Sequence, residues 1–231
     1  MKAGSINSTV VASRKHKVFA EDKFSCYSHF LGAVLSFFAT ILMVDKVGFY
    51  GTGIKMFSVF VFGISLVLLY SASALYHYIS ADSPYKTMAQ KFDHMMIYVL
   101  IAGSYTPITL LSFPLSKGVP IFKTVWIVAL IGIFITLLWV KSPKWLNSLI
   151  YISMGWVIIF NIKNVTTYLS AGAFALLLAG GIIYTVGGII YALKIKALEN
   201  RFPGFGAHEL FHLFVMAGSL CHIVMVYFYL I

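Results

Sequence analysis

The stretch KMFSVFVFGISLVLLYSASALYHYI, residues 55–79, decides the fold of this 231-residue chain. After its first lysine it contains no Asp, Glu, Lys or Arg, and it is longer than the roughly 20 apolar residues that an α-helix needs to cross a bilayer. In lipid, backbone N–H and C=O groups must be paired within the segment itself. The stretch is therefore predicted to be a membrane-spanning helix.

Six further apolar runs have the same character, and short polar or Gly/Pro segments separate them. They lie at about 26–44, 92–112, 122–141, 146–162, 169–193 and 208–230, and 146–162 is the shortest. Only 10% of all residues are charged, against roughly 25% in soluble domains. We predict an all-α integral membrane protein, a seven-transmembrane helix bundle, with one membrane domain at 26–231 and a polar N-terminal segment at 1–25.

The basic residues predict how the bundle is oriented. Twelve lysines and arginines fall in the N-terminal segment and in the second, fourth and sixth loops, and five fall in the other loops. The positive-inside rule then predicts a cytoplasmic N-terminus and an outside C-terminus, in a multi-pass protein of the cell membrane. The net charge of +10 is scattered over short loops, which favours contacts with lipid headgroups over nucleic acid. No cleaved signal peptide is expected.

Ionisable residues inside apolar spans cost a few kcal/mol each on insertion scales and therefore indicate function. Four of them gather at one end of the predicted bundle. His77 lies near the end of the second span, Asp93 at the start of the third, and His208 and His212 in the first turns of the seventh. Contact with headgroups explains any one of them alone, but their convergence at the cytoplasmic end predicts a site.

The histidine spacing favours a metal. His208 and His212 are four residues apart, about 40° around a helix, so both can bind one ion, and His77 would be a third ligand. Three protein ligands with an open fourth position are typical of catalytic zinc. Asp93 could hold the zinc-bound water by a hydrogen bond. Ser73, one turn before His77, could orient water or substrate, although a serine that packs helices together is an equal alternative.

The segment 208–212 also reads H-E-x-x-H, the pattern in which Glu209 would be the general base of a metalloprotease. No N-x-x-P-D-G stretch supplies a further ligand, and Glu209 points about 100° away from His208. We expect Glu209 to face headgroups or to stabilise the first helical turn.

Three other histidines also lie within the apolar runs. His222 lies ten residues past His212, roughly 15 Å deeper, so we expect a hydrogen-bonded core residue outside the metal shell. His29 lies near the cytoplasmic face and could complete the site. His94 must face another side of its helix than Asp93, with an interfacial role favoured over support of the site.

Six motifs, taken in order, resemble the hemolysin III family, the bacterial branch of the progestin and adipoQ receptor family. They are SALYH at 73–77, KFDH at 91–94, GSYTP at 103–107, MGW at 154–156, GIIY at 181–184 and HELFHLFVMAGSLCH at 208–222. The resemblance implies seven helices, a cytoplasmic N-terminus and a zinc site near the inner face, with His77, His208 and His212 as ligands and Asp93 holding the water. It also implies a location in a bacterial plasma membrane and kinship with alkaline ceramidases, and so hydrolysis of a lipid amide.

The leading hypothesis is a zinc-dependent hydrolase of a membrane lipid amide, ceramide-like in chemistry, whose substrate arrives from the bilayer. One alternative is a pore-forming cytolysin or a receptor-like membrane protein with structural zinc. The third is an intramembrane metalloprotease. The sequence predicts no oligomeric state.

Overall fold

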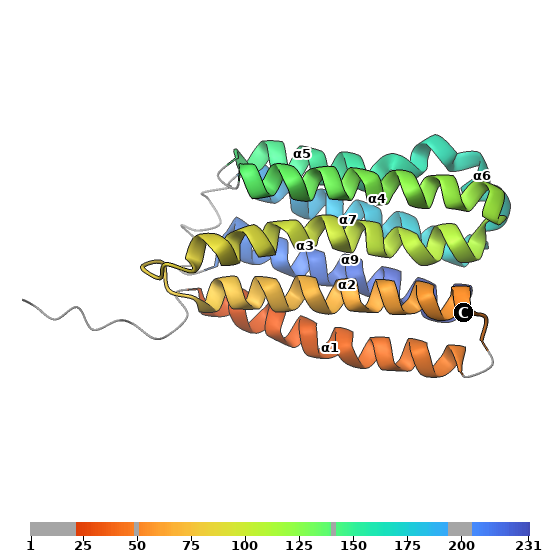
Figure 1. Cartoon of the computed structure of the whole chain (residues 1–231), viewed down its shortest axis with the longest axis horizontal. Coiled ribbons are helices and arrows are strands. Elements are labelled where there is room, and N and C mark those ends of the chain that lie inside the picture. The colour runs from red at the N-terminus through yellow and green to blue at the C-terminus, as the bar shows by residue number, and fades with distance from the viewer. Residues whose placement is uncertain (1–21, 49–50, 140–141, 194–204) are drawn as a thin grey trace, which may run out of the picture.

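A computed structural model describes residues 22–48, 51–139, 142–193 and 205–231. Within these ranges the regular secondary structure is helical throughout, and seven helices are long and apolar enough to cross a membrane. They lie side by side as an elongated bundle (Figure 1). The predicted all-α, seven-helix fold is confirmed. Most of the N-terminal segment predicted at 1–25 falls outside the described residues.

The helices alternate in direction along the bundle. In chain order they are α1 (Lys23–Val47), α2 (Gly53–Tyr78), α3 (Lys86–Pro107) with the π-helix η1 (Ile108–Ser112), α4 (Leu115–Leu138), α5 (Lys144–Gly155) with the 3-10 helix η2 (Trp156–Asn161) and α6 (Ile162–Tyr168), α7 (Ala171–Leu193), and α9 (Ala207–Met225) with the π-helix η3 (Val226–Leu230).

Several helices extend past the apolar runs that predicted them. The third span begins at Lys86 rather than at 92, and the fifth ends at Tyr168 rather than at 162. Helical hydrogen bonding continues into polar segments once the chain leaves the hydrocarbon core, so apolarity alone underestimates helix length. The fifth span is also broken, since η2 separates α5 from α6.

The alternation of direction brings one end of every span to the same end of the bundle. The starts of α1, α3 and α9 and the end of α2 are among them, and the C-terminus lies at the opposite end (Figure 1). Of the neighbouring pairs, α1 packs along α2, α2 along α3, and α7 along α9. Residues far apart in sequence thus meet at one depth.

Small residues allow close approach between the elements. A Cβ added at Gly63 in α2 would lie 2.3 Å from the Thr40 side chain of α1. A Cβ added at Gly118 in α4 would lie 1.8 Å from the Thr109 carbonyl oxygen of η1. Glycine lets helices in a membrane pack with backbones nearly in contact.

The Gly118 contact generates a test of this packing. Because the obstacle is a backbone atom that no rotamer change can move, Gly118→Ala is expected to destabilise the protein by about 1–3 kcal/mol. The measurement is thermal unfolding in detergent. Gly53→Ala is the control, since an added Cβ there meets nothing within 4 Å. Equal melting temperatures for the two variants would contradict the packing described.

Candidate metal centre

Three histidines from two helices meet at the shared end of the bundle. His77 lies in the last turn of α2, and His208 and His212 lie one turn apart at the start of α9. One ring nitrogen from each can be chosen so that all three lie within 4.8 Å of one another. His77 and His212 are buried and His208 is half-buried. The structure therefore brings together the three residues predicted as metal ligands.

The spacing of these nitrogens suits a small divalent ion. His208 Nε2 lies 3.1 Å from His77 Nε2. Two nitrogens that bind one zinc tetrahedrally at 2.0–2.1 Å would be about 3.3 Å apart. The ring planes of His77, His208 and His212 are tilted by 43° to 76° and their centroids are 4.6 to 4.9 Å apart, so these rings do not stack on one another. The three residues could hold a metal ion once their nitrogens, which lie within 4.8 Å of one another, move to that spacing.

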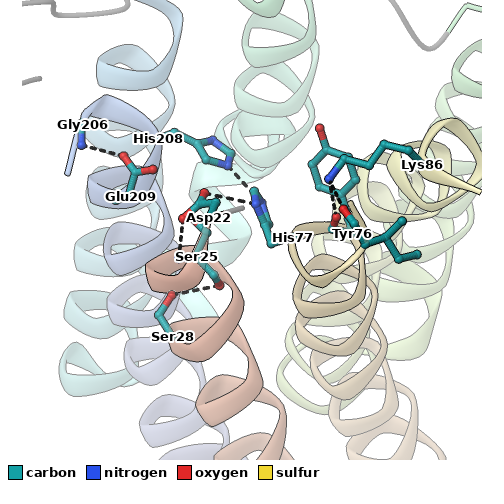
Figure 2. A network of polar contacts seen from close by, with 10 residues as sticks. Asp22, Ser25, Ser28, Tyr76, His77, Lys86, Gly206, His208 and Glu209 are labelled. Atoms are coloured by element: carbon teal, nitrogen blue, oxygen red, sulfur yellow. Dashed lines mark hydrogen bonds and ion pairs between the residues drawn. The ribbon is translucent and has the colours of Figure 1, made fainter. Parts of the chain in front are cut away.

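The first turn of α9 is fixed by Glu209. Its Oε2 accepts a hydrogen bond of 2.6 Å from the backbone N–H of Gly206, the N-cap residue of α9 (Figure 2). This bond pairs an N–H group that the helix start would leave without a partner. Glu209 thus stabilises the helix that carries two of the histidines, which is one of the two roles expected for it. Its carboxylate is occupied by this cap, which weakens the metalloprotease alternative.

Asp22, which the sequence analysis did not single out, contacts the cluster directly. Its Oδ2 lies 3.2 Å from His77 Nδ1, and its Oδ1 accepts a hydrogen bond of 3.0 Å from the Ser25 backbone N–H (Figure 2). Burial raises the pKa of the Asp22 carboxyl, but hydrogen bonds from His77 and Ser25 lower it by more, so the pKa lies below its usual range. The available signal was an aspartate just before the first apolar run, which is typical of a helix N-cap.

His29 of α1 touches the cluster without joining it. Its ring stacks on that of His212, with centroids 3.7 Å apart and planes at 18°, and it meets the Tyr70 ring edge-on. Ligand lone pairs lie in the plane of an imidazole, so two stacked rings do not point at one ion. His29 is not in the three-histidine group. In this arrangement it packs against a candidate ligand and does not complete the shell.

Asp93 and Ser73 lie beside the histidines. Both are buried, and both line the cavity that the three histidines also line. Ser73 and His77 both lie close enough to the Asp93 carboxylate to act on it electrostatically. Asp93 is not in the ligand group, which suits a carboxylate that acts on a bound water rather than on the metal.

The cavity extends far beyond the cluster. Its volume is about 620 Å³, and it runs between α2, α3, α5, α7 and α9 with mostly apolar walls. His94 lines it as well, so this residue faces the interior of the bundle and not only the interface.

His222 lies at the deep end of the cavity. It is buried, but among the described residues neither of its ring nitrogens has a hydrogen-bond partner. His222 is thus a core residue as expected, but the prediction that it is hydrogen-bonded is wrong for the described part of the chain. The ring packs into space that Gly180 leaves open, where an added Cβ would come within 2.4 Å of it.

Comparison with known proteins places this geometry in context. The family model described as haemolysin-III related matches residues 18–223. The chain is 35% identical over 209 residues to a hemolysin-3 homolog of Bacillus subtilis, covering 90% of this chain and 94% of that protein. It is 35% identical over 219 residues to hemolysin-3 of Bacillus cereus, covering 95% and 96%. It is also 28% identical over 178 residues to the human monocyte to macrophage differentiation factor, covering 74% and 69%.

Metal analysis tests the cluster. Each of His77→Ala, His208→Ala and His212→Ala is expected to weaken binding by more than the 10–100-fold typical for loss of an outer-shell partner, because a ligand itself is removed. The measurement is the metal content of purified protein, with a chelator titration for affinity. His222→Ala is the control and should keep its metal. Full metal content in all three ligand variants would refute the site.

Proposed function

This chain belongs to the haemolysin-III-related family, a set of multi-pass membrane proteins that includes bacterial hemolysin-3, and from that premise we propose that it is a zinc-dependent hydrolase of a membrane lipid amide, ceramide-like in chemistry. One observation carries the proposal. Three histidines and a buried carboxylate lie at one end of a membrane-spanning bundle, at the mouth of a long apolar cavity. In a bilayer that the seven helices cross, lipid headgroups and their amide bonds would lie at the level of that end.

The donor set favours zinc among divalent metals. All three candidate ligands are imidazole nitrogens, whereas magnesium and calcium prefer oxygen ligands. Three protein ligands leave a fourth position open, as in catalytic zinc sites. When bound, zinc polarises a carbonyl and lowers the pKa of water to roughly 7.

Asp93 is the proposed general base. It accepts a proton from the attacking water as the new C–O bond forms, and it returns that proton to the amide nitrogen as the C–N bond breaks. The products are a carboxylic acid and an amine, and no further reactant is needed. Ser73, the neighbour of Asp93, donates a hydrogen bond that holds the carboxylate toward the reacting group.

The cavity provides room for the apolar part of such a substrate. Its 620 Å³ falls within the 300–1,000 Å³ typical of small-molecule sites. Leu100, Ile108 and Phe174 are among the side chains that line it away from the histidines. A lipid placed there has its acyl chain between the helices and its amide beside Asp93.

The hydrolase proposal predicts that Asp93→Asn lowers kcat by about 10²–10⁴, the usual contribution of a general base, while bound zinc stays unchanged. Ser73→Ala should give a smaller loss. The measurement is release of fatty acid from ceramides and acyl amides by zinc-loaded protein in vesicles. Ser58→Ala, which alters a buried serine of α2 that does not line the cavity, is the control. Zinc-replete wild-type protein that cleaves none of these lipids would sink the proposal.

A cytolytic pore is the second candidate, because two relatives carry the name hemolysin-3 or hemolysin-3 homolog. The mostly apolar walls of the cavity do not suit a water-filled lumen within one chain, so a pore would need several copies. A receptor-like protein with structural zinc remains the companion alternative.

Conductance across planar bilayers separates these functions. The hydrolase proposal predicts no channel current from purified wild-type protein or from His208→Ala. Single-channel currents that are equal in the two proteins would show a pore that does not depend on the metal, and would leave the hydrolase without a role in lysis.

A further inference from the structure

Helix α1 supplies none of the three candidate ligands, yet its first turn contacts one of them. We propose that Asp22 is a positioning residue that holds His77 in the tautomer and orientation in which Nε2 binds the metal. This inference rests on the zinc site proposed above and deepens it. The observation behind it is the pair of contacts on the two nitrogens of one imidazole, Asp22 on one and His208 on the other.

The two nitrogens of the His77 ring have different partners. Its Nδ1 lies 3.2 Å from Asp22 Oδ2, and its Nε2 lies 3.1 Å from His208 Nε2, inside the cluster. A carboxylate can only accept hydrogen bonds, so it draws the imidazole proton to Nδ1. The lone pair then lies on Nε2, which points at the other ligands. A carboxylate behind a histidine in this way orients the ring and increases its basicity as a ligand.

Asp22 is itself held in place. Its Oδ1 accepts the Ser25 backbone N–H at 3.0 Å, which makes it the N-cap of α1. The two oxygens therefore serve two different partners, one on its own helix and one on α2. With both oxygens engaged, the Asp22 carboxylate is held in one orientation beside His77 (Figure 2).

Lys86 holds the end of α2 from the other side. The Lys86 Nζ donates to the carbonyl oxygens of Tyr76 and Ile79 at 2.7 and 2.8 Å, and this ammonium group lies over the Tyr76 ring (Figure 2). The turn that carries His77 is thus fixed to the start of α3, and Asp22 controls the remaining freedom, which is the rotation and tautomer of the ring.

A helix cap alone requires one oxygen, whereas the positioning role requires the second. Asp22→Ser separates the two, because serine is a good N-cap but offers a single oxygen. The expected result is a zinc affinity 10–100-fold weaker than that of wild type, with the melting temperature of the metal-free protein little changed. Asp45→Ser, at an exposed aspartate near the opposite end of α1, is the matched control and should bind zinc as wild type does.

The affinity is measured on the full chain in detergent by competition with a chromophoric zinc chelator. A second comparison uses His77→Ala, where adding Asp22→Ser should cost no further affinity if Asp22 acts through His77. Unchanged zinc affinity in Asp22→Ser, or an equal loss in both backgrounds, would overturn the inference. Weakened zinc in Asp22→Ser with no lipid cleavage by wild type would instead overturn only the hydrolase.

Discussion

Backbone groups in lipid have no water to bond with, and the rest of this structure follows from that constraint. It requires helices, and wherever the chain departs from the α-helix, other groups must pair with the backbone N–H and C=O groups that lose their helical partners. The break in the fifth span is an example. The hydroxyl of Tyr105 on α3 donates to the Gly155 carbonyl at 2.6 Å and accepts the Ile158 N–H at 2.9 Å, so one side chain serves both sides of the junction between α5 and η2. A buried tyrosine on a neighbouring helix thereby allows an irregular segment at membrane depth.

The same constraint explains why the polar cluster lies at a helix end. An unpaired imidazole or carboxylate is least costly near the interface, and at that depth the ends of four helices are available together. The cluster is arranged in two layers. Helices α2 and α9 supply the three histidines, and the start of α1 supplies two contacts behind them, Asp22 on His77 and His29 on His212. The ligands are thus oriented by a helix that provides none of them.

Much of this could be predicted from sequence because it depends on short-range patterns. Apolar run length predicted the spans, and the spacing of His208 and His212 predicted a shared helix face. The missed features depend on how separate helices pack. Asp22 lies in a polar segment, and the periodicity of the sequence does not show how close that segment comes to His77. The stacking of His29 on His212 depends on how α1 and α9 cross. The placement of the His222 ring depends on Gly180 of the neighbouring helix, where an added Cβ would come within 2.4 Å of that ring.

The cluster also bears on how the bundle is held together. Each of the three imidazoles offers a ring nitrogen within 4.8 Å of those of the other two. A bound ion would join the end of α2 to the start of α9, which are separated by 131 residues at the His77–His208 contact. Any ligand that binds only the folded state stabilises it, so a metal here would cross-link the fold and prepare the site at once. Asp22 extends that link to α1, so a metal bound here would owe a structural role and a catalytic role to the same contacts.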